Sequence, residues 1–203
     1  MNITKFVTKE NQVNLLQKIA DVFVKWQNWK LIKGTVPPEA HRCVFVFAPH
    51  TSNWDWFLGT MVMNYWRLPM KVAIKDVWHK FPFGMFLKPL GALAIDRSSA
   101  KGLSQVDKIA KLFETNEKIS FVITPEGTRK IRERWKTGFF HIANKANVPI
   151  VVLKAHFKDK TVEFGPVLYP AEGLDTVMTK MMKFYANCGP VYPELFSLDQ
   201  RYV

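Results

Sequence analysis

The sequence predicts an α/β fold: a single domain whose largely parallel central sheet is flanked by helices, preceded by an amphipathic N-terminal helix. Strand-length apolar runs alternate with helical patterns along the chain, which is typical of parallel strands connected by helices. The run 42–48 is apolar at nearly every position, as expected of a strand covered on both faces. A chain of 203 residues, 48% hydrophobic and 23% charged, is long enough to bury one such core.

The first element is an amphipathic helix. Apolar side chains at i, i+3, i+4 and i+7 predict this helix between Leu15 and Trp26, with Lys18 and Lys25 beside its apolar stripe. Such a helix can lie in a membrane interface, or it can pack on the rest of the protein. We therefore expect an amphipathic helical segment over residues 1–28 and one domain over residues 29–203.

Strands and helices then alternate within the domain. Apolar runs bounded by turn residues predict strands at 29–33, 42–48, 71–75, 92–96, 119–123, 149–154 and 161–165. Apolar residues at helical spacing predict helices at about 101–114, 138–147 and 174–185, and a further helix, capped by Ser52 or Asn53, that reaches about Tyr65.

The charge of the chain limits the partners that it could bind, and its cysteine content limits the compartment in which we expect it. The 29 Lys and Arg residues exceed the 17 Asp and Glu residues, giving a net charge of +12. A basic surface attracts nucleic acid, an anionic membrane face or an acidic substrate carrier, or it serves solubility alone. Cys43 and Cys188 form no disulfide framework or metal spacing, which favours a reduced, cytoplasmic compartment. Without a secretory signal or a long apolar run, we expect peripheral association with the cytoplasmic face of a membrane.

His50 and Asp55 are the first candidate catalytic residues. His50 follows the apolar strand 42–48, and Asp55 opens the next helix after a four-residue spacer. A carboxylate at this distance can hold the imidazole in one tautomer, so that the histidine acts as a general base. Ligands of open α/β sheets also bind beyond the carboxyl ends of strands. Alone the spacing is weak, because a His-x4-Asp pair arises by chance in roughly one such chain in five.

Other strand ends carry polar or turn residues as well. The segment GALAIDR ends in Asp96 and Arg97, TPEGTR spans residues 124–129 after another strand, and VPIVVL spans 148–153. Arg129 can hold a phosphate or carboxylate through two parallel hydrogen bonds. These ends should meet at the same edge of the sheet as His50.

The order PHTSNWD, GALAIDR, TPEGTR and VPIVVL, within residues 42–154, resembles the lysophospholipid and glycerol-phosphate acyltransferase family, of the 1-acylglycerol-3-phosphate acyltransferase type. The resemblance implies a glycerol-phosphate acyltransferase-like fold. It also implies transfer of a fatty acyl group from an acyl-CoA or acyl-carrier-protein thioester to the hydroxyl of a lysophospholipid, namely 1-acylglycerol-3-phosphate, in membrane lipid synthesis. In that mechanism His50 would be the general base and Asp55 its orienting partner.

The resemblance also assigns a binding site for the acceptor. Its residues would be Glu126, Gly127, Thr128 and Arg129, with Arg129 on the anionic headgroup and Arg97 and Lys75 as further candidates. The residues around the first block, however, leave the acceptor open, so that a lyso-aminolipid or glycerol phosphate stays an alternative. A non-catalytic basic lipid-binding module is the other alternative.

Partners and cofactors follow from the same chemistry. A thioester is already activated, so we expect no metal and no cofactor beyond acyl-CoA or acyl carrier protein as co-substrate. The basic run 129–136, with Ile131 and Trp135 interleaved, suits anionic lipid, coenzyme A phosphates or an acidic carrier protein. We expect no nucleic-acid partner, because no recognised nucleic-acid module accompanies the charge. The aromatic residues of the helix after His50, such as Trp54 and Phe57, could line an acyl groove, enter a membrane interface or belong to the core.

Overall fold

The structure is a computed structural model that describes residues 14–32, 36–74, 90–94 and 104–203. Its helices are α1 (Leu15–Trp26), α2 (Asn53–Tyr65), α5 (Gln105–Thr115), α6 (Gly138–Ala146) and α7 (Leu174–Tyr185). Its strands are β1 (Lys30–Ile32), β2 (Arg42–Ala48), β3 (Met70–Ile74), β4 (Ala92–Ala94), β5 (Ile119–Ile123), β6 (Ile150–His156) and β7 (Thr161–Leu168). Short 3-10 turns lie at η1 (Pro38–His41), η2 (Pro170–Glu172) and η3 (Pro193–Leu195).

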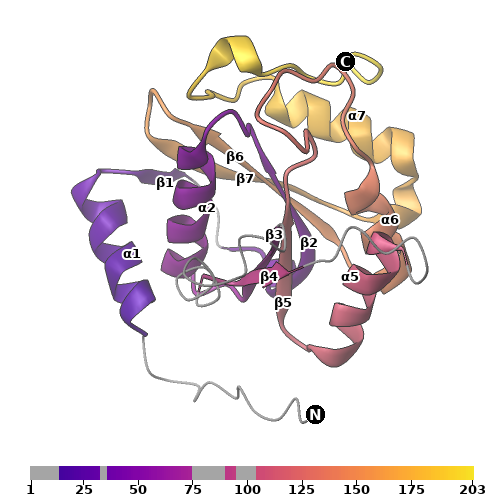
Figure 1. Cartoon of the computed structure of the whole chain (residues 1–203). Coiled ribbons are helices and arrows are strands. Elements are labelled where there is room, and N and C mark those ends of the chain that lie inside the picture. The colour runs from indigo at the N-terminus through magenta and orange to yellow at the C-terminus, as the bar shows by residue number, and fades with distance from the viewer. Residues whose placement is uncertain (1–13, 33–35, 75–89, 95–103) are drawn as a thin grey trace.

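The described strands form one seven-stranded sheet in the order β1-β7-β6-β2-β5-β3-β4 (Figure 1). Neighbouring strands run parallel except β6 and β7, which form an antiparallel pair. The predicted α/β class with a largely parallel sheet is therefore confirmed. Because β2 lies between β5 and β6, its carboxyl end opens near the middle of one edge of the sheet.

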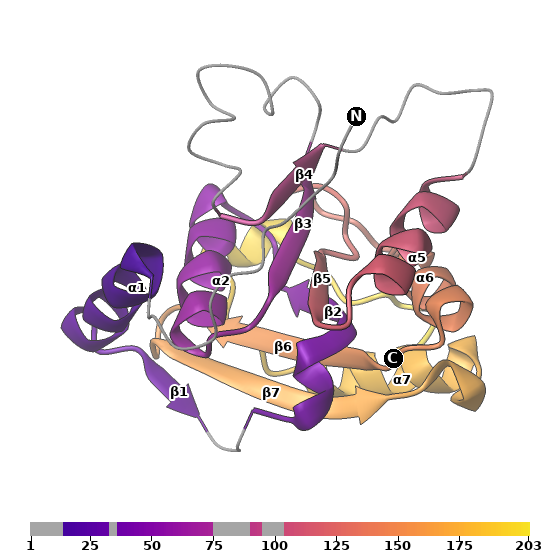
Figure 2. The ribbon, with the colours of Figure 1, turned by 90° about the horizontal axis from the view of Figure 1, so that it is seen from below.

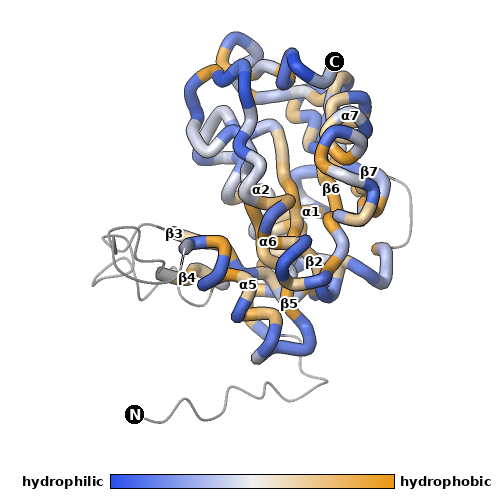
Figure 3. The backbone as a smooth tube through the Cα atoms, turned by 90° about the vertical axis from the view of Figure 1, so that its right-hand side faces the viewer, coloured by the Kyte–Doolittle hydropathy of each residue, from blue (hydrophilic) through white to orange (hydrophobic). Residues whose placement is uncertain are grey.

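Helices cover both faces of this sheet. Figure 2 shows α1 and α2 on one side and α5, α6 and α7 on the other. Successive side chains of a strand point to opposite faces, so β2 contributes to both cores. Val44, Val46 and Ala48 belong to the cluster that contains residues of α5, α6 and α7. Cys43, Phe45 and Phe47 belong to the cluster that contains residues of α2. The hydrophobic colouring in Figure 3 accordingly runs through the interior of the molecule.

Helix α1 begins with a capping box, in which Asn14 Oδ1 accepts a hydrogen bond from Gln17 N and Gln17 Oε1 accepts one from Asn14 N. It packs on α2. The rings of Phe23 and Phe57 meet edge to face there, with their centroids 5.1 Å apart. Among the described residues, no helix is both long enough and apolar enough to cross a bilayer.

Candidate active site

The turn between β2 and α2 holds His50 and Asp55 together. Ser52 is the N-cap of α2, and its Oγ accepts a hydrogen bond from Trp54 N at 3.1 Å. Asp55, at the third helical position, completes the capping box by accepting a hydrogen bond from Ser52 N at 2.6 Å. The chain therefore passes from strand to helix within a few residues, which brings both side chains to the carboxyl edge of the sheet.

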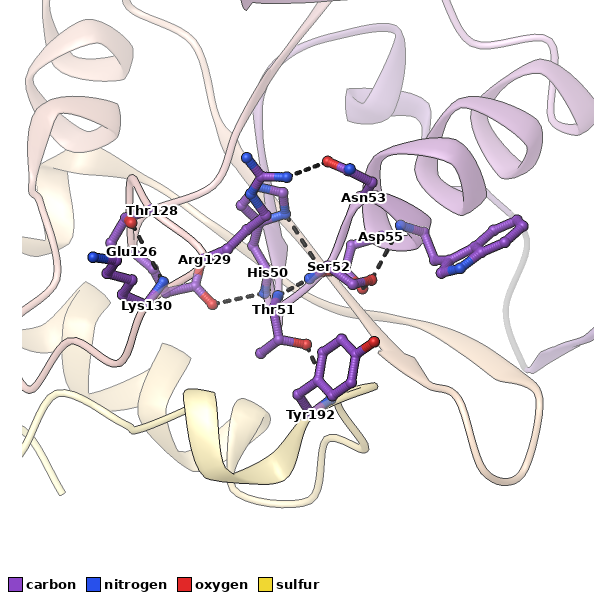
Figure 4. A network of polar contacts seen from close by, with 11 residues as sticks. His50, Thr51, Ser52, Asn53, Asp55, Glu126, Thr128, Arg129, Lys130 and Tyr192 are labelled. Carbon is purple, nitrogen blue, oxygen red and sulfur yellow. Dashed lines mark hydrogen bonds and ion pairs between the residues drawn. The ribbon is translucent and has the colours of Figure 1, made fainter.

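Asp55 is fully buried and held by several donors. Its Oδ2 accepts hydrogen bonds from Thr51 N at 2.5 Å and Ser52 N at 2.6 Å, and its Oδ1 accepts one from Ser52 Oγ at 3.1 Å. His50 Nδ1 lies 3.5 Å from Asp55 Oδ2, within ion-pair range but longer than an ordinary hydrogen bond (Figure 4). Hydrogen bonds of catalytic groups are often this long before substrate binds. The pairing predicted from the sequence is present, and the His50 side chain stays 20% exposed.

Glu126 joins the second motif to the first. β5 runs parallel to β2 and pairs with it, so their carboxyl ends lie at the same edge of the sheet. Glu126 follows β5, and its Oε1 accepts a hydrogen bond from His50 N at 2.9 Å. The residue is only 5% exposed, and this burial raises the pKa of its carboxyl group to about 7. Its Oε2 is buried and has no hydrogen-bond partner among the described residues.

The remaining residues of the motif lie on the loop between β5 and α6. Gly127 has φ +64°, in the region that favours glycine, and a Cβ there would lie 3.1 Å from the Lys136 side chain. Thr128 Oγ1 accepts a hydrogen bond from Lys130 N at 3.3 Å. Arg129 reaches across to α2, where its guanidinium donates to Asn53 Oδ1 (Figure 4). The motif thus presents an exposed cation beside the helix that carries Asp55.

The structure brings His50, Asp55, Glu126 and Arg129 to one edge of the sheet. The other two candidates, Arg97 and Lys75, lie outside the described residues. Among the described residues, no group of three or more His, Cys, Asp or Glu side chains is arranged to hold a metal ion.

The sequence interpretation missed a contribution from the end of the chain. Tyr192 N donates a hydrogen bond to Thr51 Oγ1 at 3.3 Å, directly beside His50 (Figure 4). Residues 186–203, which we call the C-terminal tail, follow α7 and carry none of the motifs. A contact across 141 positions leaves no periodic pattern from which it could have been found.

A histidine beside a buried carboxylate at the carboxyl edge of an α/β sheet is an arrangement that can perform acid–base chemistry. A family model described as Acyltransferase matches residues 30–154, more than half of the chain. The chain belongs to this acyltransferase family, which confirms the resemblance indicated by its sequence blocks. The protein is accordingly an acyltransferase, an enzyme that moves an acyl group from a donor to an acceptor.

Among solved structures, the fold is similar to that of the 1-acyl-sn-glycerophosphate (LPA) acyltransferase PlsC from Thermotoga maritima. The two chains superpose with a TM-score of 0.55 and share 14% sequence identity, over 80% of this chain and 70% of that chain. At this identity the likeness is one of fold. A comparison with curated protein sequences found no match.

Proposed function

We propose that the protein transfers a fatty acyl group from an acyl-CoA or acyl-carrier-protein thioester to the free hydroxyl of 1-acylglycerol-3-phosphate. The observation that carries this proposal is the His50–Asp55 pair, in which Asp55 is fixed by three hydrogen bonds and lies 3.5 Å from His50 Nδ1. With Nδ1 directed at the carboxylate, Nε2 is the ring nitrogen left for the acceptor hydroxyl.

The reaction needs one base that later becomes an acid. His50 Nε2 takes the proton of the acceptor hydroxyl while the hydroxyl oxygen attacks the thioester carbonyl carbon. The tetrahedral intermediate then collapses, the C–S bond breaks, and the imidazolium returns the proton to the leaving thiolate. An ester and a free thiol result. Asp55 stabilises the imidazolium between these two steps.

Arg129 supports an anionic acceptor. Its guanidinium lies on the exposed side of the site, against Asn53 at the start of α2. Arginine binds phosphate through paired, charge-assisted hydrogen bonds, and the N-terminus of a helix favours negative charge. A phosphate beside Arg129 would place the glycerol backbone of the acceptor toward His50.

Helix α1 supports docking on an anionic membrane. Leu15, Ile19, Val22 and Trp26 are 74%, 48%, 66% and 78% exposed, and their spacing aligns them on one side of the helix. The opposite side, which carries the buried Ala20, faces the domain. The sequence left two alternatives for this helix, packing on the rest of the protein or lying in a membrane interface. Packing on the domain buries only some of its apolar side chains and leaves these four exposed. We propose that the exposed stripe, flanked by Lys18 and Lys25, lies in the interface with its lysines on anionic headgroups.

Aromatic rings connect this membrane-facing stripe to the site. The centroid of the Phe57 ring lies 5.1 Å from that of Phe23 on α1 and 5.9 Å from that of Trp54 on α2. Trp54 is 64% exposed and lies one residue before Asp55. A lysophospholipid could therefore keep its acyl chain in the bilayer beside Trp54 while its headgroup reaches His50.

The test is acyl transfer by the purified protein. Radiolabelled acyl-CoA and acyl-carrier protein are offered in separate arms with lysophosphatidate, a lyso-aminolipid or glycerol 3-phosphate as acceptor. We expect lysophosphatidate to be acylated and His50→Ala to lower the rate by about 10²- to 10⁴-fold. Asp55→Ala should lower it less, because the imidazole remains. His141→Ala, at an exposed histidine of α6, is the matched control. No transfer to any acceptor, or a His50→Ala variant as active as wild type, would refute the proposal.

A further inference from the structure

The C-terminal tail lies outside the residues 30–154 that the family model matches. Figure 1 shows it in yellow, crossing the same end of the molecule as the loops after β2 and β5. Its first part pairs with the last residue of β6 through an isolated parallel bridge between His156 and Gly189. Phe157 N donates a hydrogen bond to Gly189 O at 2.8 Å, and Gly189 N donates one to Ala155 O at 3.2 Å. The tail is therefore anchored before it reaches the site.

The tail first meets the turn that carries the proposed base. Tyr192 N donates a hydrogen bond to Thr51 Oγ1 at 3.3 Å. Thr51 is 3% exposed, and its own backbone N–H donates to Asp55 Oδ2 at 2.5 Å. One residue therefore contacts the tail through its side chain and the proposed orienting carboxylate through its backbone.

The tail next meets the loop between β5 and α6. Asp199 is fully buried, and its Oδ2 accepts a hydrogen bond from Trp135 N at 2.9 Å. The Arg201 guanidinium donates to both carboxylate oxygens, at 2.9 and 2.7 Å. Burial would raise the pKa of Asp199, but these hydrogen bonds hold it below its usual value. Trp135 is in addition fixed from its other end, because its Nε1 donates to Ser197 O at 2.9 Å.

Trp135 lies at the base of the loop that carries Glu126. The next residue, Lys136, donates a backbone hydrogen bond to Pro125 O at 2.9 Å and so closes the loop. Glu126 follows Pro125 and accepts the hydrogen bond from His50 N. Direct contacts therefore run from Asp199 through Trp135 and the loop base to the backbone of His50.

We propose that the C-terminal tail is a brace of the active site and that Asp199 is a positioning residue. It fixes the loop base at Trp135, and through that base it sets the hydrogen bond between Glu126 and His50. An ion pair between a buried carboxylate and a partly exposed guanidinium, as in Asp199 and Arg201, adds little stability compared with apolar packing, but it holds the carboxylate in a defined position. Displacing a catalytic group by about 1 Å can slow a reaction by about 10²-fold, so holding His50 in position would matter for the rate.

Amide hydrogen exchange at His50, followed by NMR, tests the brace without depending on activity. Asp199→Asn should accelerate exchange of the His50 amide by about tenfold, since its bond to Glu126 opens more often. Glu194→Gln, which neutralises an exposed carboxylate on the same tail, should leave the exchange unchanged. Arg201→Gln, at a partly exposed partner of Asp199, should act in the same direction and serves if Asp199→Asn does not fold. His50 exchange that stays at the wild-type rate while Trp135 exchange accelerates would overturn the proposal.

Kinetics provide a second readout that rests on the proposed function. Asp199→Asn should lower kcat/KM for acyl transfer by about 10-fold to 10²-fold. Asp199 is proposed to act through Glu126. The double variant Asp199→Asn/Glu126→Ala should therefore be about as active as Glu126→Ala alone, because effects of residues in one network do not add. Losses that multiply would mean that Asp199 only stabilises the fold, and the brace would be wrong. A wild-type protein without transfer would refute the proposed function, and the exchange at His50 would still decide the brace.

Discussion

The buried carboxyl group of Glu126 makes the stability of the protein depend on pH in a defined direction. Its pKa rises from an ordinary value of 4.5 to about 7, chiefly because burial disfavours the ionised form. Below pH 4.5 the group is protonated in the folded and the unfolded chain, so it has no effect. Between 4.5 and about 7 only the unfolded chain loses the proton, so the folded state loses stability as the pH rises. Above 7 the loss is complete.

The size of this effect follows from the two pKa values. They differ by about 2.5, and each pKa unit corresponds to about 1.36 kcal/mol, so the ionised Glu126 destabilises the fold by about 3 kcal/mol above pH 7. Glu126→Gln removes the ionisation and keeps an amide oxygen that can accept the hydrogen bond from His50 N. We expect the variant to exceed wild type in free energy of unfolding by up to about 3 kcal/mol at pH 8.5 and to equal it near pH 4.5.

Urea denaturation at a series of pH values between 4.5 and 8.5 measures this difference. Glu114→Gln, at an exposed glutamate of α5, is the matched control and should stay within about 0.5 kcal/mol of wild type throughout. A Glu126→Gln variant that differs from wild type by the same amount at every pH would refute the reasoning. A variant less stable than wild type at pH 8.5 would mean that the site requires the carboxylate ion.

Two further predictions concern the acceptor and the membrane. Arg129→Ala should raise the KM for lysophosphatidate by about tenfold or more with a smaller change in kcat, and Arg129→Lys should restore only part of the loss because lysine lacks the paired donors. Lys111→Ala, at an exposed lysine of α5 outside the basic run, is the kinetic control, and a KM equal to wild type in Arg129→Ala would exclude the proposed headgroup contact. Val22→Glu should reduce the fraction of protein that sediments with anionic vesicles several-fold more than Asn144→Glu does. Asn144→Glu makes the same change in charge at an exposed position of α6. Equal binding by both variants would exclude the α1 stripe as the docking face.

The sequence predicted best those elements whose signal is local. Residues 42–48, 119–123 and 174–185 were predicted with the observed bounds, because each is an apolar run or stripe bounded by turn residues. β7 extends three residues beyond the predicted strand, since its end is decided by pairing with β6. η1 was not predicted, because a short 3-10 turn leaves no periodic pattern.

The candidate site was predictable only in part, because only some of its contacts join residues that are close in the sequence. His50 and Asp55 are five positions apart, so that spacing alone indicated their contact. The hydrogen bond from His50 N to Glu126 joins residues 76 positions apart, and the one from Trp135 N to Asp199 spans 64. Those contacts depend on how β2, β5 and the tail meet in three dimensions. A motif could indicate that Glu126 matters, but it could not indicate that its carboxylate accepts from the backbone of the proposed base.

The capping box of α2 limits how this enzyme can be inactivated. In many enzymes, removing a buried catalytic charge relieves strain and makes the protein more stable. Here the carboxylate of Asp55 also satisfies the backbone N–H groups of Thr51 and Ser52, so its loss would leave buried donors unpaired, at about 1–3 kcal/mol each. The proposed orienting role of Asp55 and its role in folding therefore rest on the same carboxylate, and no substitution at that position removes one role alone. A substrate-trapping variant suitable for crystallisation with bound lipid is better made at His50, whose side chain caps nothing.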